Sequence, residues 1–232
     1  MATHIPDGAS VKVVVDAVDA TCAALEGDPE TSGLAPTWLG LRDKADGLGK
    51  ARSDCDRSAL RARARLAVCD VKWDATVAAF GRSVVDAAGG RRDQPPYTRF
   101  FAKAAPSLVQ KFGIQREIES ARDWLVELAR NPAELLSLTW TPRLKDATDL
   151  LEAAFNQRNE TVKAIGPLQT SVVLFIDEVN RELDRLEGDL KKLFPGAPER
   201  VGSYLAATRS DRTSAHEEPK PAPEPVPPLS VK

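Results

Sequence analysis

Histidine is nearly absent from this chain: the 232 residues include only His4 and His216. Both lie in terminal segments that we expect to be disordered, so the folded part should lack histidine as a general base or metal ligand. The three cysteines form no CxxC pair, and no glycine-rich loop of the form GxxxxGK precedes a serine or threonine. We therefore expect no enzyme activity, no catalytic or cofactor-binding residues and no metal site.

The chain also lacks a long apolar run and a strong charge of either sign. No segment is apolar over the length needed to cross a bilayer, and the N-terminal residues lack the basic region of a signal peptide. The formal net charge is -2. These features predict a soluble protein, located in the cytoplasm, with no membrane partner.

What the chain does contain is apolar residues at alternating steps of four and three. Such a sustained period requires a helix to keep one face against a partner, as in a coiled coil. The predicted seams are Leu41, Ala45, Leu48, Arg52, Cys55, Ala59, Ala62, Leu66, Cys69, Trp73, Thr76 and Phe80, and Leu144, Thr148, Leu151, Phe155, Arg158, Val162, Ile165, Gln169, Val172, Ile176, Val179, Leu183, Leu186, Leu190 and Leu193. We interpret Cys55 and Cys69, with Cys22 on a shorter helix, as small apolar packing residues.

The pattern of residues 11 to 101 recurs about 103 positions later, which indicates an internal duplication. In each copy a short helix comes first, a Thr-Trp pair follows, and a long helix comes next. The two pairs are Thr37-Trp38 and Thr139-Trp140. Shared spacing carries this prediction more than residue identity does.

Proline and glycine set the predicted limits of the long helices. Thr141 followed by Pro142 is typical of an N-cap with proline in the first turn. Paired breakers end the two helices: Gly89-Gly90 and Pro195-Gly196. Each long helix should contain about 50 residues and span about 75 Å.

Gly166-Pro167 interrupts the second seam. Proline removes one helical hydrogen bond and crowds a carbonyl in the preceding turn. Because the seam continues in phase across the pair, we favour a kink there, with a hairpin turn as the alternative.

The predicted fold is therefore all-α: an elongated helical bundle or coiled coil built from two tandem repeats of a short and a long helix. The expected organisation is a disordered N-terminus over residues 1–9, repeat 1 over 10–112, repeat 2 over 113–207 and a disordered Pro-rich tail over 208–232. Both repeats should form one bundle.

Opposite charges mark the two long helices. From residue 50 to 92 there are ten basic and five acidic residues, whereas from 145 to 192 there are seven basic and ten acidic residues. Opposite flanking charges favour the pairing of unlike helices. The two long helices could pair within one chain or between the two chains of a homodimer. The sequence does not distinguish these alternatives.

A row of arginines offers a nucleic-acid hypothesis. Arg57, Arg61 and Arg65 are four residues apart and share a face, with Arg63 between them. Against this interpretation, Asp54 and Asp56 interrupt the stretch and no aromatic residue is interleaved to stack on bases. We favour a solvated or internally paired face.

Aromatic residues gather in the Pro-flanked connection between the repeats. Phe100, Phe101 and Phe112 are the candidate interaction residues, close to Tyr97. A cap that closes the bundle end is the favoured interpretation, and an exposed docking patch is the alternative.

The C-terminal residues are rich in proline, which favours extended polyproline II. Leu229 and Val231 follow the last proline and are the other candidate interaction residues. A tethering spacer with a short terminal motif is one interpretation, and a solubilising tail is the other.

Together these features predict a non-enzymatic helical scaffold or adaptor that mediates protein-protein interaction. The alternative is a ligand-binding or regulatory bundle in which the polar seam residues Arg52, Arg158 and Gln169 line a pocket. Nucleic-acid binding through the arginine row is the less favoured hypothesis, and no cofactor is expected.

Overall fold

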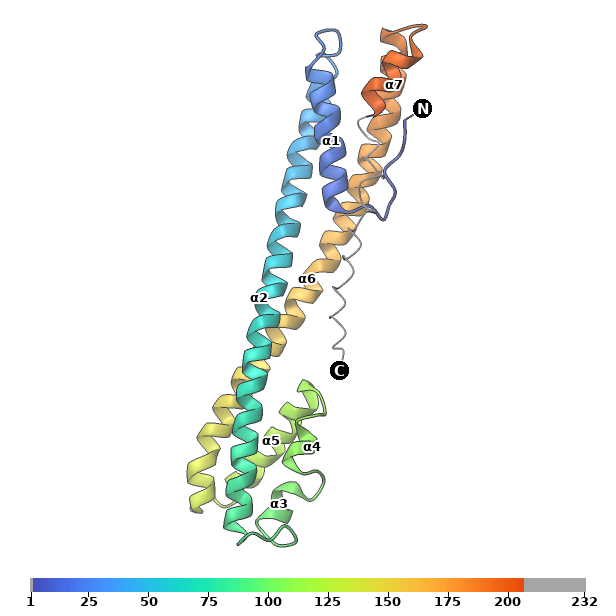
Figure 1. Ribbon diagram of the computed structural model, residues 1–232. Helices are drawn as coiled ribbons and strands as arrows, with labels where there is room; N and C mark the ends of the chain where they lie inside the picture. Colours follow the sequence, from blue (N-terminus) through green and yellow to red (C-terminus); the bar gives the residue numbers. More distant parts are fainter. Residues whose placement is uncertain (1, 207–232) are drawn as a thin grey trace, which may run out of the picture. The chain divides into compact units, whose positions relative to one another are not determined.

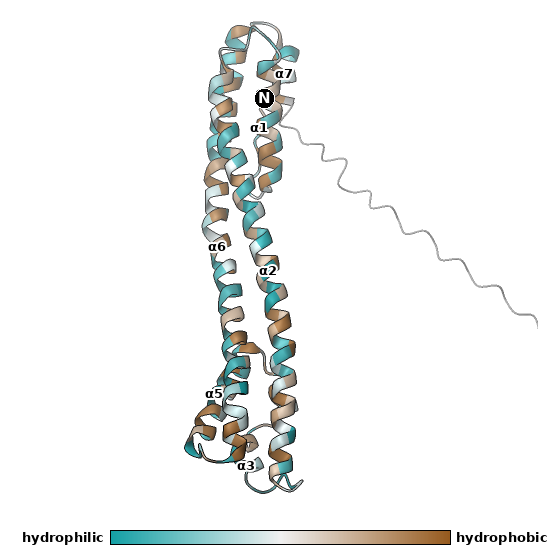
Figure 2. Cartoon of the chain, turned by 90° about the vertical axis from the view of Figure 1, so that its left-hand side faces the viewer, coloured by the Kyte–Doolittle hydropathy of each residue, from teal (hydrophilic) through white to brown (hydrophobic). Residues whose placement is uncertain are grey.

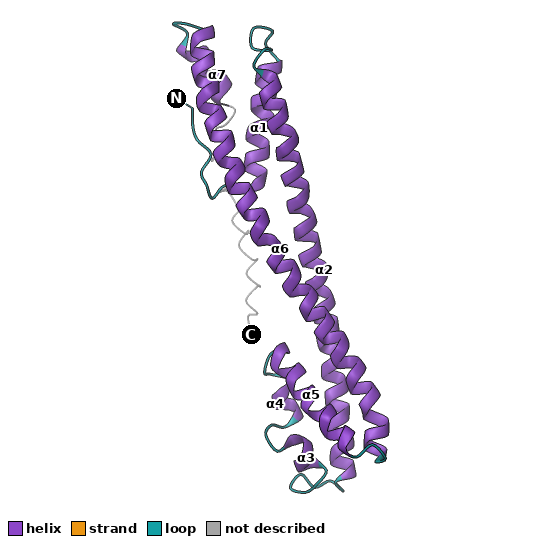
Figure 3. Ribbon diagram, turned by 180° about the vertical axis from the view of Figure 1, so that it is seen from behind, coloured by secondary structure: helices purple, strands orange, loops and turns teal. Residues whose placement is uncertain are grey.

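A computed structural model describes residues 2–206 of the chain, and this part is mostly helical without any strand (Figure 1). Figure 3 shows the same helices joined by short loops. None of the described helices has the length and apolar character needed to cross a membrane. The elements are α1 (Val11–Glu26), α2 (Ala35–Ala87), α3 (Tyr97–Phe101), α4 (Pro106–Val109), α5 (Ile114–Arg130), α6 (Leu135–Leu193) and α7 (Pro198–Ala206).

The chain divides into two compact units. Among the described residues, unit 1 contains residues 2–50 and 170–206, and unit 2 is Ala51–Gln169. Each long helix, α2 and α6, contributes one part to each unit. The units therefore cut across the repeats that the sequence suggests.

Unit 1 has a core formed by α1, α7 and the adjoining parts of α2 and α6. Ser10 caps the start of helix α1, and its hydroxyl accepts the N–H of Val13 at 3.4 Å. Its apolar face is buried, including Val18 and Leu25, which are fully shielded from solvent. Cys22, which is also buried, lies on this face as its spacing predicts.

The N-terminal segment corrects the expectation of a disordered terminus over residues 1–9. Residues 2–9 form no helix, but they lie against α6. Ile5 is buried, its N–H donates to Asn180 Oδ1 at 2.8 Å, and its carbonyl accepts from Asn180 Nδ2 at 2.9 Å. His4 contacts Asp184 at 2.8 Å. One buried side chain and a two-way amide pairing are enough to hold a segment that composition alone marks as a tail.

Unit 2 has a separate core in which aromatic rings dominate. Phe80 of α2 is fully buried and lies at ring-centre distances of 5.3 Å from Phe100, 5.7 Å from Phe101, 5.9 Å from Trp124 and 5.7 Å from Trp140. Trp73, also fully buried, donates its indole N–H to Thr148 Oγ1 at 3.3 Å. The core therefore joins α2 and α6 to the short helices α3 to α5.

Glycine ends the two long helices where the sequence predicts. Gly89, Gly90 and Gly196 have positive φ angles of 62°, 82° and 81°, which residues with a Cβ adopt at a cost. The lengths, 53 residues for α2 and 59 for α6, agree with the expected scale.

The predicted start of α6 at Thr141 is wrong. The helix begins at Leu135, and Pro142 lies inside it. Trp140 is buried in the unit 2 core, and Ser137 donates its hydroxyl to the carbonyl of Leu128 at 2.9 Å. These contacts stabilise an additional helical segment before the proline, which then removes only one internal hydrogen bond.

The hairpin alternative at Gly166-Pro167 is also wrong, because α6 runs through both residues as one helix. The continuous apolar phase on either side already favoured this outcome. The angle of any kink there remains a prediction.

Candidate functional site

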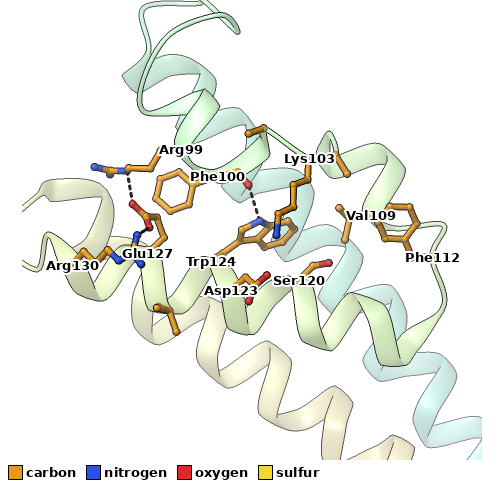
Figure 4. Close-up of a pocket in the computed structure, with 13 residues that line it drawn as sticks. Arg99, Phe100, Lys103, Val109, Phe112, Ser120, Asp123, Trp124, Glu127 and Arg130 are labelled. Atoms are coloured by element: carbon orange, nitrogen blue, oxygen red, sulfur yellow. Dashed lines mark hydrogen bonds and ion pairs between the residues drawn. The ribbon is translucent and has the colours of Figure 1, made fainter.

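The candidate site is a cleft of about 500 Å³ within unit 2, between α5 and the segment that carries α3 and α4 (Figure 4). Helix α3 and the loop after it supply one wall, and the exposed side of α5 supplies the other. The lining residues are Arg99, Phe100, Ala102, Lys103, Ala104, Val109, Phe112, Ser120, Asp123, Trp124, Val126, Glu127 and Arg130.

The floor of the cleft is apolar and rigidly held. Trp124 lines the cleft and donates its indole N–H to the carbonyl of Phe100 at 3.0 Å, which fixes the ring. Phe100 and Val109 are buried beside it. Since the indole donor is already used, the floor offers dispersion contacts rather than a free hydrogen bond.

Phe112 is the exception among the aromatic residues of the site. It lies in the turn between α4 and α5, and its side chain is 38% exposed. Val126, on the opposite wall, is 59% exposed. The cleft therefore presents apolar surface to solvent on two sides.

One end of the cleft carries an ion-pair network. Arg99 binds Glu134 with two hydrogen bonds, of 3.2 and 2.6 Å, and approaches Glu127 at 3.6 Å. Arg130 pairs with the same Glu127 at 2.6 Å. The Glu134 contact raises the pKa of Arg99, and the Arg99 contact lowers the pKa of Glu134. The guanidinium of Arg99 also lies 5.0 Å from the ring centre of Phe100, so this network fixes the wall of the cleft.

Lys103 and Asp123 lack a hydrogen-bond or ion-pair partner among the described residues. Both are exposed, and Figure 4 shows the Lys103 side chain extending from its loop across the cleft. One unpaired charge of each sign thus borders the apolar floor. A bound molecule with a negative and a positive group could pair with Lys103 and Asp123, respectively.

The candidate interaction residues from the sequence fall in different places. Phe100 and Phe101 are buried, at 6% and 4% exposure, and belong to the aromatic core. Phe112 borders the cleft. Leu229 and Val231 lie outside the described residues. The structure thus brings the three phenylalanines into one region but leaves only Phe112 substantially accessible.

Sequence reasoning missed Trp124 and Lys103. Steps of four and three from Ala121 along α5 select Leu125 and Leu128 as its apolar face, whereas Trp124 is buried and Leu125 only partly so. Trp124 is three residues after Ala121, so the helical spacing contained the signal. Lys103 carried no such signal, because its position depends on how the loop folds over α5.

The polar seam residues Arg52, Arg158 and Gln169 do not form a pocket lining. Arg52 pairs with Asp56 at 3.0 Å one turn along α2, and Arg158 donates to Asn159 Oδ1 at 3.2 Å. Gln169 is exposed. None of the three lines the cleft. In the arginine row, Arg65 donates to Gln157 Oε1 at 3.2 Å, and Arg57, Arg61 and Arg63 are exposed.

A second polar feature of unit 2 is an acidic cluster of Asp70 and Asp74 on α2 and Glu117 on α5. Glu117 is 4% exposed, and its Oε1 accepts the N–H of Gly113 at 3.2 Å. Glu117 Oε2 and Asp74 Oδ1 are buried without a hydrogen-bond partner. Burial, reinforced by Asp70, raises the pKa of both carboxyls. Within residues 2–206 no group of His, Cys, Asp and Glu side chains is arranged to hold a metal ion.

Comparisons of the chain with protein families, with curated proteins and with solved structures gave no match. The fold and the cleft therefore define the class of the protein: an all-α protein with an apolar, charge-bordered cleft.

Proposed function

We propose that this protein is a non-enzymatic scaffold or adaptor, and that the cleft beside α5 binds a segment of a partner protein. The observation that carries the proposal is that the exposed ring of Phe112 borders the same cleft as the buried, hydrogen-bonded Trp124. Exposed apolar surface with a polar border is typical of protein interaction sites.

The chemistry of the cleft favours a partner with an apolar anchor residue. An aromatic or branched aliphatic side chain would pack against Phe112 and the floor formed by Val109 and Trp124, since buried anchors of this kind supply most of the affinity at interfaces. Lys103 and Asp123 would pair with an acidic and a basic residue of the same segment. The Arg99 network, which is ion-paired within the chain, would hold the wall in place.

The proposal includes the construction that the sequence suggests. In each half of the chain a short helix precedes a long one: α1 precedes α2, and α5 precedes α6. The paired residues Trp38 and Trp140 are both buried near the start of a long helix. These features support two copies of one ancestral unit. The proposal further takes the long helices as coiled-coil helices, the location as the cytoplasm and the Pro-rich C-terminal residues as a tether.

The test begins with a photo-crosslinking amino acid in place of Phe112 in the full chain, expressed in the cells of origin. The matched control carries it in place of Leu150, which is 53% exposed and lies on α6 away from the cleft. We expect one protein to cross-link at residue 112 and not at residue 150.

The captured protein is then purified and its affinity measured by calorimetry. Phe112→Ala should weaken binding at least about 10-fold, equivalent to about 1.4 kcal/mol, while Leu150→Ala should not change it. Lys103→Glu should also weaken it. Unchanged affinity in Phe112→Ala would refute the site. Turnover of a substrate by the purified protein, lost on substitution of a carboxylate, would refute the adaptor function itself.

A further inference from the structure

Helix α2 carries two apolar faces in unit 2, and only one is covered. One face contains the buried residues Ala62 and Trp73 and belongs to the predicted seam. The other face, here the outer stripe, consists of Leu60, Ala64, Ala67, Val71 and Ala75. Since each residue turns the helix by about 100°, Leu60 points about 200° away from Ala62. The outer stripe therefore lies on the opposite side of the helix.

The outer stripe is open to solvent within the chain. Leu60 and Val71 are each 68% exposed, and the three alanines between and after them are exposed as well. Figure 2 shows hydrophobic residues recurring along this helix. The residues of the outer stripe are spaced by four, three, four and four positions, which is the period of a second helix-packing seam. A surface helix normally needs only one such stripe.

Charge is distributed unevenly along the outer stripe. Residues 57–65 contain four arginines and no acid, whereas residues 66–75 contain Asp70, Asp74 and one lysine. Arg57, Arg61 and Arg63 lack an ion-pair partner among the described residues. One end of the stripe thus has an excess of positive charge and the other a slight excess of negative charge.

The acidic end lacks nearby compensation. Asp74 Oδ1 and Glu117 Oε2 are buried without a partner, and the pKa of each carboxyl is raised by burial and then by Asp70. Positive charge brought close to Asp70 would relieve this repulsion. The chain carries suitable arginines on the same helix, but too far along it to reach Asp70 themselves.

We propose that the outer stripe is the contact surface of an antiparallel dimer formed by two copies of this chain. The antiparallel direction places the arginine end of one copy beside the acidic end of the other. A parallel, in-register pair would place the four arginines beside the same four arginines, which is repulsive.

The side chains fit the antiparallel register. Leu60 lies opposite Val71 of the partner subunit, and Ala64 lies opposite Ala67 of the partner subunit. Large residues then meet near the ends, and small residues at the centre allow the helices to approach closely. Arg63 meets Asp70 of the partner subunit on the flank. This inference does not depend on the function of the cleft.

Sedimentation equilibrium of the full chain tests association. Between about 1 μM and 1 mM, a range that covers weak association, the mean mass should rise from the monomer toward twice that value. Leu60→Lys should abolish the rise. The matched control Leu150→Lys, a similarly exposed leucine on α6, should not. A wild-type chain that stays monomeric, or equal effects of both variants, would overturn the proposal.

Disulfide trapping tests the direction. Leu60→Cys and Val71→Cys chains, oxidised separately, should stay uncrosslinked, because in an antiparallel pair the two copies of residue 60 are about 16 Å apart along the axis. An equimolar mixture should give a cross-linked heterodimer. Cross-linking of each variant with itself would show a parallel pair. Wild-type protein measures any contribution from its own cysteines.

Polyanion binding is the competing outcome for the arginine row. A short DNA duplex is added to the wild type and to Arg57→Glu/Arg63→Glu at low salt. We expect the double variant to dimerise more weakly than the wild type. We expect neither protein to shift the mobility of the DNA. A DNA shift by the wild type that is lost in the variant, with dimerisation unaffected, would assign the row to nucleic acid instead.

Discussion

Replacing Phe101 with alanine removes a ring from the aromatic core of unit 2. The side chain is 4% exposed. Its neighbours, with their ring-centre distances, are Tyr97 at 5.2 Å, Trp124 at 5.4 Å, Phe80 at 5.7 Å and Phe100 at 6.3 Å. The neighbouring rings come from α2, α3 and α5, so the cavity left behind would lie where these elements meet.

The expected loss follows from burial and cavity formation. A Phe-to-Ala change in a core costs about 3 to 5 kcal/mol, and favourable aromatic pairs add about 0.5 to 1.5 kcal/mol each beyond burial. Because these ring contacts overlap with the burial contribution, we expect a value near 4 to 5 kcal/mol. That is a large part of the roughly 5 to 15 kcal/mol by which natural domains are stable.

Urea unfolding followed by tryptophan fluorescence measures the change. Trp73, Trp124 and Trp140 lie in unit 2, and only Trp38 lies in unit 1, so the signal reports mainly on the affected unit. Phe112→Ala is the matched control, because the same truncation at a 38% exposed ring should cost less than half as much.

A loss of unfolding free energy below about 1 kcal/mol for Phe101→Ala would refute the core assignment, because truncating a buried aromatic residue to alanine costs about 3 to 5 kcal/mol. Equal losses for Phe101→Ala and Phe112→Ala would also contradict it. In that event the aromatic connection would have to be exposed, as the docking-patch interpretation requires.

Two further substitutions test single polar groups. Glu117→Gln keeps an acceptor for the N–H of Gly113 but removes a buried charge that has no ion-pair partner among the described residues, so unfolding free energy at pH 7 should rise by about 1 kcal/mol. Because the folded pKa of Glu117 is raised above its ordinary 4.5, the cost of its charge vanishes below that pH, and the gain should shrink as melting is measured toward pH 4.5. A gain that is constant with pH would contradict this cause. Thr148→Val should lower unfolding free energy by about 1 to 3 kcal/mol, since it leaves the buried indole N–H of Trp73 without an acceptor. Thr148→Ser, which keeps the hydroxyl, should cost less in the same urea titration; an equal cost would mean that the hydrogen bond contributes nothing.

Much of the fold could be predicted because the spacing of apolar residues in the sequence indicates helices. Val18 and Leu25 on the short helix, and Leu183 and Leu190 on the long one, are buried as their period requires. Helix boundaries near proline were harder to predict. Pro142 is compatible with both the start and the interior of a helix, and the burial of Trp140 decided between them.

The site was less predictable than the fold. Phe100 and Phe112 belong to one aromatic group in the sequence, yet one is buried and the other borders a cleft. Which ring is covered depends on how the loop before α4 crosses α5. The burial of Ile5 could not be predicted for the same reason. Its backbone is held by Asn180, which lies 175 positions away in the sequence.

The sequence by itself determined that this is an all-α protein, which residues face inward along most of each long helix, and where glycine ends those helices. These are local properties, set by period and by backbone sterics. Only the tertiary structure decided that the long helices contribute to two cores, that Glu117 and Oδ1 of Asp74 are buried, and that Lys103 extends over Trp124. Such outcomes depend on contacts between residues far apart in the chain, and no local period encodes them.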